Sequence, residues 1–174
     1  LVTRMLTEGA ESPADLIFAQ DSGHLGALAK AGALAPLPPA LLDQVHPAYR
    51  DDAGMWIGTS GRMRVLVYNT DVLNDGAMPP TLWDLSDPKW AGKLGWAPGN
   101  GSFQAHVSAL RSAWGEDKTR EWLTAMKANN PTVYPKNSPQ VEAAGKGEIQ
   151  IGWVNHYYLH RFDRQTTPAA NYRF

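Results

Sequence analysis

Two adjacent tyrosines, Tyr157 and Tyr158, are the residues of this chain whose type and spacing most directly suggest chemistry. They follow an apolar run, residues 149–154, that predicts a buried strand, and ligands of open α/β sheets bind beyond the carboxyl ends of the strands. In a regular strand, two neighbouring side chains point to opposite faces. If the strand ends at Asn155 and the chain turns into a helix, both phenols can converge on one cleft. The alternative is a structural role, in which both rings pack at a domain edge and both hydroxyls remain in water.

A phenol is a poor metal ligand until it loses its proton, which normally requires a pH near ~10. A bound trivalent metal stabilises the phenolate and lowers that pKa steeply, so a tyrosine pair suits a hard, highly charged cation. The chain has no cysteine, which excludes disulfides and thiolate metal sites. His, Asp, Glu and Tyr are therefore the possible metal-ligating side chains.

A glycine-rich turn, Pro98-Gly99-Asn100-Gly101-Ser102, stands at the predicted start of a helix. Glycines let backbone N–H groups approach a ligand, and a helix N-terminus favours anions. The sequence therefore predicts either an anion site at this turn or an ordinary helix cap.

Composition limits the possible classes of protein. The chain has 174 residues, 43% hydrophobic and 19% charged, with a net charge of −1 and no basic stripe, so the electrostatic pattern of a nucleic-acid-binding protein is missing. No run of about 18 apolar residues occurs, and no membrane-spanning segment is predicted.

The predicted elements alternate between strands and helices, which indicates an α/β sandwich with a largely parallel sheet. The expected strands are residues 14–19, 55–59, 64–69, 93–96, 131–134 and 149–154. Four helices are also expected. The first follows Asp21 or Ser22 as its N-cap, and the second spans about 103–114. The third spans about 117–128 with Asp117 as its N-cap, and the fourth has Asn137 or Ser138 as its N-cap.

An ordered set of motifs covers nearly the whole chain and resembles the periplasmic ferric-iron-binding proteins of ABC transporters. The set includes Asn155-His156-Tyr157-Tyr158 and the segments 14–21, 60–69, 83–85, 90–95, 98–103 and 133–138. The resemblance implies an α/β fold of the type II periplasmic-binding-protein class, with two α/β lobes joined by hinge strands and an incomplete first lobe.

The resemblance also implies how the chain is divided. Residues 1–76 would form part of the first lobe with the crossing strand, residues 77–165 the second lobe, and residues 166–174 the start of a return segment. Family members are longer at both ends, so we expect this chain to be a fragment. A periplasmic or extracellular location is implied, as a secreted protein or lipoprotein whose signal segment is not within this stretch.

The function implied by the resemblance is capture of Fe(III) with a synergistic anion, phosphate or carbonate, for delivery to an ABC permease, without catalysis. Tyr157 and Tyr158 would ligate the metal. Anion contacts would come from Asn100, Gly101 and Ser102, with further anion or ligand-supporting contacts from Asn137 and Asn155. From the residues alone, a helix N-cap at Asn137 and a strand-end turn at Asn155 are equally open.

Two departures from the family pattern bear on the metal. Gln20 stands where some relatives have a glutamate ligand, so either anion or water fills more of the metal shell, or the neighbouring Asp21 contributes, or the ligand is not iron. Phe103 stands near the position of a further tyrosine in a subgroup, so a three-tyrosine arrangement is not supported.

Arg62 and Arg64 share one face of the crossing strand, where they either line the cleft and attract an anion or are solvated.

Two other functions remain open at this point. One is a receptor of the same fold for another small solute, such as a phosphonate, a polyamine or a thiamine-like ligand. The other is a metal-dependent hydrolase that uses His156 and His160, whose spacing places both imidazoles on one face of an α-helix. The chain has no HExxH motif and no nucleophile elbow, and exposed surface histidines are the alternative.

Overall fold

The computed structural model describes residues 1–162 and 166–172, which form two compact units, Leu1–Gly61 and Arg62–Phe174. Residues 163–165 of the predicted second lobe and residues 173–174 of the predicted return segment lie outside the described residues. The strand at residues 64–69 belongs by its contacts to the second unit, and the division into lobes at residue 76 stays a prediction.

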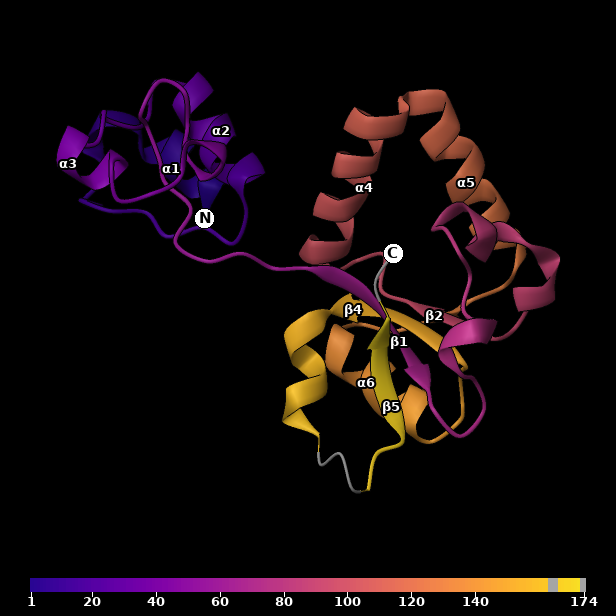
Figure 1. The fold of residues 1–174 in the computed structure, drawn as a ribbon. Helices are drawn as coiled ribbons and strands as arrows, with labels where there is room; N and C mark the ends of the chain where they lie inside the picture. Colours follow the sequence, from indigo (N-terminus) through magenta and orange to yellow (C-terminus); the bar gives the residue numbers. More distant parts are fainter. Residues whose placement is uncertain (163–165, 173–174) are drawn as a thin grey trace. The chain divides into compact units, whose positions relative to one another are not determined.

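The second unit is built on a mixed sheet with the strand order β3-β2-β4-β1-β5 (Figure 1). Its strands are β1 (Arg64–Asn69), β2 (Leu94–Trp96), β3 (Thr132–Val133), β4 (Ile151–Asn155) and β5 (Ala169–Tyr172). β2 pairs in parallel with β3 and β4, whereas β1 pairs antiparallel with β4 and β5. The expected largely parallel sheet is therefore wrong for the described residues, because β1 runs against both of its neighbours.

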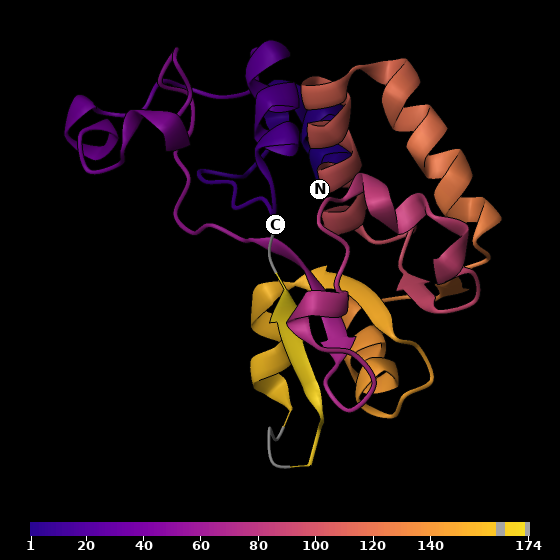
Figure 2. The ribbon, with the colours of Figure 1, turned by 45° about the vertical axis from the view of Figure 1, so that its right-hand side comes forward.

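Helices cover both faces of this sheet. The α-helices are α4 (Gly101–Trp114), α5 (Glu116–Ala128) and α6 (Asn137–Gly145), and the 3-10 helices are η3 (Asp75–Ala77), η4 (Trp83–Ser86), η5 (Pro88–Trp90) and η6 (His156–Arg161). Figure 2 shows α4 and α5 as a helical hairpin. Gly115 joins the two helices with φ 86°, a conformation that glycine adopts without strain.

The two faces of β1 explain this layered arrangement. Its side chains alternate, so that Leu66 and Tyr68 join one core cluster while Val65 and Val67 join the other. The first cluster is closed by residues of α4 and α5, namely Phe103, Leu110, Trp122 and Met126, and the second by residues of α6, namely Val141, Ala143 and Ala144. A strand buried on both faces reads as a continuous apolar run, which is why residues 64–69 were predictable from sequence.

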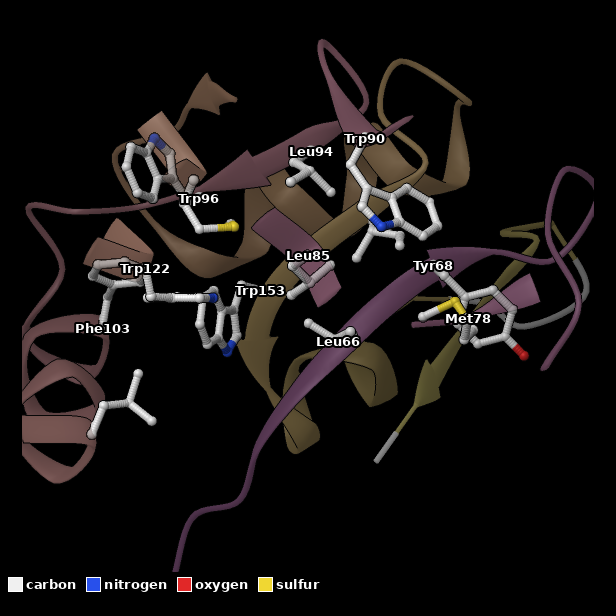
Figure 3. Packing of buried hydrophobic residues seen from close by; sticks show 13 residues of the cluster. Leu66, Tyr68, Met78, Leu85, Trp90, Leu94, Trp96, Phe103, Trp122 and Trp153 are labelled. Atoms are coloured by element: carbon white, nitrogen blue, oxygen red, sulfur yellow. The ribbon is translucent and has the colours of Figure 1, made fainter. Parts of the chain in front are cut away.

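Trp153 of β4 is the centre of the first core cluster (Figure 3). Its ring makes edge contacts with Phe103 at 5.5 Å and with Trp122 at 5.0 Å between centroids. The Trp122 indole Nε1 donates a hydrogen bond of 3.0 Å to the backbone oxygen of Leu82. Aromatic pairs of this geometry contribute about 0.5–1.5 kcal/mol each beyond burial, so this cluster fixes the hairpin of α4 and α5 on the sheet.

A close approach across the sheet requires glycine at position 95. A Cβ added to Gly95 of β2 would lie 2.5 Å from Cδ1 of Ile149 and 3.0 Å from the ring of Tyr134. Since real Cβ atoms do not come this close, a side chain here would force the buried side chain of Ile149 to move. Glycine in a strand often marks such a close approach.

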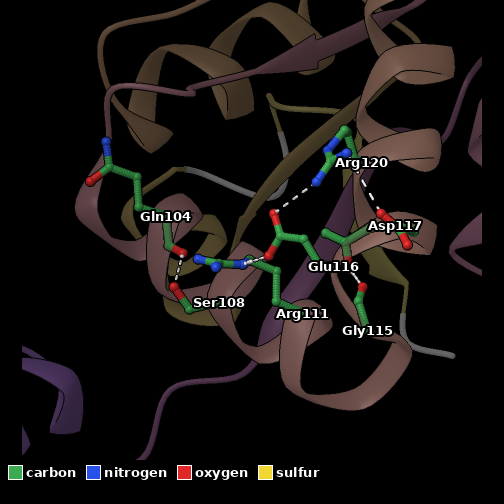
Figure 4. Close-up of polar contacts among 8 residues, drawn as sticks. Gln104, Ser108, Arg111, Gly115, Glu116, Asp117 and Arg120 are labelled. Carbon is green, nitrogen blue, oxygen red and sulfur yellow. Dashed lines mark hydrogen bonds and ion pairs between the residues drawn. The ribbon is translucent and has the colours of Figure 1, made fainter.

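The start of α5 differs from the prediction. Gly115 is the N-cap and the helix begins at Glu116, so Asp117 lies in the first turn and is 98% exposed instead of capping. Figure 4 shows that Arg111 and Arg120 both reach Glu116, at 2.5 Å and 3.7 Å, while Arg120 also reaches Asp117 at 3.6 Å. Exposed ion pairs contribute about 0–1 kcal/mol, so this network is a surface feature of the hairpin.

The first unit contains α1 (Val2–Glu8), η1 (Gly9–Glu11), α2 (Ser22–Lys30), α3 (Pro39–Leu42) and η2 (Pro47–Tyr49). The predicted N-cap of α2 is confirmed, because the Asp21 carboxylate accepts a 3.1 Å hydrogen bond from the backbone N–H of His24. Capping of this kind satisfies an N–H that has no partner within the helix.

The strands predicted in the first unit are wrong. Residues 14–19 form no strand, and residues 55–59 form only an isolated bridge between Arg50 and Ile57. A buried strand needs a neighbour for its backbone N–H and C=O groups, and the 14–19 segment pairs with none of the described residues. Its apolar side chains are exposed as a result, Leu16 by 83% and Phe18 by 72%.

The first unit has almost no core. Leu28 is the only buried side chain among residues 1–61, and a groove of about 360 Å³ opens between α1 and the 12–18 segment. The clusters of buried hydrophobic residues belong to the second unit. None of the helices in the described part of the chain is long and apolar enough to cross a membrane.

We predict that backbone protection is concentrated in the second unit. Because apolar burial is the main stabilising term, the amides of β1, β4 and α6 should exchange with deuterium orders of magnitude more slowly than those of residues 1–61. Hydrogen exchange read by mass spectrometry, with the urea-unfolded protein as the reference for full exchange, measures this. Uniform protection along the chain would contradict the prediction.

Candidate metal and anion site

The site predicted from sequence lies at one edge of the sheet. β2, β3 and β4 run in the same direction, so their carboxyl ends share this edge, where ligands of α/β sheets bind. β1 runs the opposite way and begins there, and its first residue, Arg64, is the register partner of Asn155, the last residue of β4. The helices α4 and α6 begin shortly after β2 and β3.

The tyrosine pair follows β4 directly. The strand ends at Asn155, and the chain turns at once into η6 (His156–Arg161). This turn brings together the rings of Tyr157 and Tyr158, which stack with centroids 4.6 Å apart and an interplanar angle of 29°. The guanidinium of Arg161 lies 4.9 Å over the ring of Tyr158.

The surroundings of Tyr157 favour its ionised form. Burial acts to raise the pKa of this phenol, but hydrogen bonds with Asn155 and Tyr158 and the charges of Arg62 and Arg161 outweigh burial, so the pKa lies below its ordinary value of 10. The Asn155 Nδ2 group donates to the Tyr157 hydroxyl oxygen at 3.2 Å. A phenol that loses its proton more readily is a better ligand for a hard cation.

Arg64 interacts electrostatically with both tyrosines, and its guanidinium is largely buried. Its Nη1 donates to Oδ1 of Asn137 and to Oδ1 of Asn155, each at 3.1 Å, and its Nη2 donates to the backbone oxygen of Trp153 at 2.6 Å. Burial lowers the pKa of Arg64 to about 10, against the opposing effect of the two tyrosines, so the group stays cationic at neutral pH. All three acceptors are uncharged. Because the guanidinium is buried and hydrogen-bonded, the alternative in which Arg64 is simply solvated is wrong.

Asn137 and Asn155 are buried amides, 0% and 2% exposed. The N-cap prediction for Asn137 is wrong, because Lys136 occupies the N-cap of α6 and Asn137 is the first helical residue, with its oxygen bound by Arg64. Its Nδ2 is buried and has no hydrogen-bond partner within the described ranges. A buried donor without a partner costs about 1–3 kcal/mol, so this group is suited to an acceptor on a ligand.

Asn155 links three parts of the site. Besides Arg64 and Tyr157, it reaches Ser102 at the start of α4, with its Nδ2 lying 3.3 Å from the Ser102 hydroxyl oxygen. It stands where the strand passes into η6 but makes no side-chain cap bond there. A strand-end turn alone therefore does not account for this side chain.

The glycine-rich turn is a helix cap in this structure. The Oδ1 of Asn100 accepts a 3.1 Å hydrogen bond from the backbone N–H of Ser102, which confirms the capping interpretation for Asn100. A Cβ built at Gly101 meets nothing within 4 Å, so the space beside this residue is open. Anion binding by Asn100, Gly101 and Ser102 stays a prediction.

His106, a half-buried residue of α4, lies close to the same edge residues through Trp153 and Arg64. Its ring packs 4.9 Å from the Trp153 ring, and its Nε2 is buried without a hydrogen-bond partner in the part of the chain that is described. Burial and then the charge of Arg64 lower the pKa of His106 to about 4, so it is neutral at physiological pH.

The histidine pair does not form the expected arrangement. His156 and His160 lie in a 3-10 helix, where three residues make a turn and positions four apart do not share a face. The His156 Nδ1 accepts a 3.2 Å hydrogen bond from the backbone N–H of Met63. Among residues 1–162 and 166–172, no three His, Asp or Glu side chains gather as a metal cluster.

The remaining predicted cleft residues are Gln20, Asp21 and Arg62. Gln20 and Asp21 belong to the first unit, where the Asp21 carboxylate caps α2 and lies 2.8 Å from Nδ1 of His24. Arg62 belongs to the second unit and its charge acts on Tyr157. Their contact with a ligand stays a prediction.

Comparison with known proteins identifies relatives of this chain. A model of the family described as bacterial extracellular solute-binding protein matches residues 11–171. The chain is 40% identical over 158 residues to the Fe(3+)-binding periplasmic protein of Serratia marcescens, covering 91% of this chain and 46% of that protein. It is 33% identical over 170 residues to the major ferric iron-binding protein of Neisseria meningitidis, covering 95% of this chain and 50% of that protein.

Solved structures agree with this relationship. The crystal structure of iron-bound HitA from Pseudomonas aeruginosa is 34% identical and matches with a TM-score of 0.91, over 98% of this chain and 56% of that chain. The predicted α/β fold of the periplasmic-binding-protein class is confirmed by this match. The chain spans about half the length of the curated relatives it matches. From the family match over residues 11–171, the chain belongs to the bacterial extracellular solute-binding proteins.

Proposed function

We propose that this chain is part of an extracytoplasmic receptor that captures Fe(III) together with an oxyanion, phosphate or carbonate, and delivers it to an ABC permease. The observation that carries the proposal is the stacked Tyr157–Tyr158 pair beside the buried Arg64 and its two amides. The names of the relatives support it, because the Serratia and Neisseria proteins are both named for ferric iron binding. Binding without turnover and a periplasmic or extracellular location are parts of the same proposal.

The two phenols supply the charge that Fe(III) requires. Fe(III) is a hard cation and prefers oxygen ligands, and each phenolate neutralises one of its charges. Binding then competes with protons, since each tyrosine that ligates as a phenolate releases one. The lowered pKa of Tyr157 reduces the cost of that release.

Two phenolates leave positive charge on the metal, which an anion would neutralise. Arg64 supplies a buried positive charge, and the Nδ2 of Asn137 is a buried donor that none of the described residues satisfies. Ser102, at the start of α4, accepts a hydrogen bond from Asn155. We call this group of residues (Arg64, Ser102, Asn137 and Asn155) the amide wall. These groups suit an oxyanion that completes the metal shell, with Asn100 and Gly101 at its edge.

The alternative solutes differ in how well they fit this wall. A polyamine is cationic, and Arg62, Arg64 and Arg161 would repel it from the tyrosine pair. A phosphonate presents the same acceptor oxygens as phosphate, so it is the second candidate ligand. Gln20 favours it over iron, because a neutral glutamine stands where some relatives have a glutamate ligand.

We predict that ferric citrate added to the protein in phosphate buffer produces a phenolate-to-iron charge-transfer band in the visible spectrum. Tyr157→Phe and Tyr158→Phe should each remove most of the band, because each deletes one ligand oxygen, and should weaken iron binding at least about 100-fold. Tyr49→Phe is the matched control, since Tyr49 is 66% exposed in the first unit and should leave the band unchanged.

A band that survives both substitutions would exclude this pair as the ligands. If no band forms in phosphate or in bicarbonate, iron capture by this chain is contradicted. A phosphonate that then raises the thermal unfolding midpoint would support the second candidate. Steady turnover of a chromogenic phosphate ester, lost in His160→Ala, would instead support the hydrolase.

We predict that iron affinity rises with pH. Below the pKa of both ligands, the release of one proton from each tyrosine makes the association constant rise by about two log units per pH unit. Tyr157→Phe should reduce this slope to about one. Competition against citrate between pH 5.5 and 7.5, corrected for the protonation of citrate, measures the slope, and an affinity that does not change with pH would rule out phenolate ligation.

A further inference from the structure

The orientation of two buried amides is set by a single side chain. An asparagine amide has an oxygen that accepts and an NH₂ group that donates, and its orientation follows from its hydrogen bonds. Arg64 has only donors, and one of its nitrogens, Nη1, lies 3.1 Å from Oδ1 of Asn137 and 3.1 Å from Oδ1 of Asn155. Both amides must therefore turn their oxygens toward Arg64.

With the oxygens fixed in this way, the NH₂ groups of Asn137 and Asn155 point away from Arg64. The Nδ2 of Asn155 is directed to the hydroxyl oxygens of Ser102 and Tyr157. The Nδ2 of Asn137 is buried and, as far as the described residues extend, has no partner. With its oxygen turned toward Arg64, Asn137 presents its NH₂ donor to a ligand, whereas the NH₂ group of Asn155 holds the hydroxyl groups of Ser102 and Tyr157 in place.

We propose that Arg64 is a positioning residue for anion recognition, which fixes Asn137 and Asn155 as donors and so makes this wall specific for an oxyanion with free acceptor oxygens. The inference rests on the proposed binding of an oxyanion with iron. Charge alone is a different explanation, because any buried cation attracts an anion. The planar guanidinium differs from a point charge in that it holds two amides and a backbone carbonyl at once.

The test separates orientation from charge. Arg64→Lys keeps the charge but cannot hold Asn137, Asn155 and the Trp153 carbonyl together. Asn137→Asp keeps an acceptor for Arg64 and removes the Nδ2 donor. The matched control is Arg111→Lys, an exposed arginine of α4 that pairs with Glu116.

The measured quantity is the ratio of iron affinity with and without inorganic phosphate, obtained by competition with citrate. We expect this ratio to fall at least about tenfold in both variants, because Arg64→Lys no longer fixes the orientation of the two amides and Asn137→Asp removes one donor to the anion. Arg111→Lys should match the unmodified protein.

Side-chain amide NMR provides a readout that a loss of stability alone would not produce. In the unmodified protein, the Nδ2 signals of Asn137 and Asn155, assigned from Asn137→Asp and Asn155→Asp, should be distinct, protected from exchange and shifted by phosphate. In a folded Arg64→Lys variant, they should lose protection and their response to phosphate.

Two outcomes would overturn different parts of this account. If the unmodified protein shows no phosphate dependence, the proposed oxyanion fails. The second outcome is a phosphate dependence that is present in the unmodified protein and unchanged in Arg64→Lys, with both amide signals still protected. The positive charge alone would then be sufficient for anion binding, and the positioning role of Arg64 would be wrong.

Discussion

The buried guanidinium of Arg64 is the group on which the architecture of this edge of the sheet depends. A buried cation needs acceptors for its donors, and Arg64 Nη1 and Nη2 find them on β4 at Trp153 and Asn155 and on α6 at Asn137, while its Nε is buried with no partner among the described residues. The antiparallel register of β1 and β4 places Arg64 opposite Asn155. A parallel β1 would have put its first residue at the other edge, so the reversed direction of this one strand is what makes the site.

The same hydrogen bonds connect the fold to the chemistry of the phenols. Asn155 accepts from Arg64 and donates to Tyr157, and that donation, with the charges of Arg62 and Arg161, lowers the pKa of Tyr157 despite its burial. The influence is mutual, because the tyrosines oppose the lowering of the pKa of Arg64. A change at any one of these groups is therefore expected to affect the others, and single substitutions here should not be additive.

Features encoded locally were predictable from the sequence, and features set by distant contacts were not. The strand at residues 64–69 was predicted correctly because a continuous apolar run indicates burial on both faces. The Asp21 cap was predicted correctly because it depends only on the next three residues. The cap at Asn137 failed because Arg64, 73 residues away, takes its oxygen. The strand at residues 14–19 failed because pairing depends on a neighbour, which propensity does not supply. The lowered pKa of His106 likewise depends on distant contacts, because its ring packs on Trp153 of β4 and lies near the charge of Arg64.

The contrast between the two units bears on how a ligand would be captured. The second unit packs its sheet on both faces, so the tyrosine pair and the amide wall are held by a core that is already formed. The conformational cost of arranging these groups is then met in folding and not in binding. The first unit, with Leu28 as its one buried side chain, lacks comparable rigidity. A ligand of Tyr157, Tyr158 and the amides that Arg64 orients would therefore meet groups that the core of the second unit already holds in place.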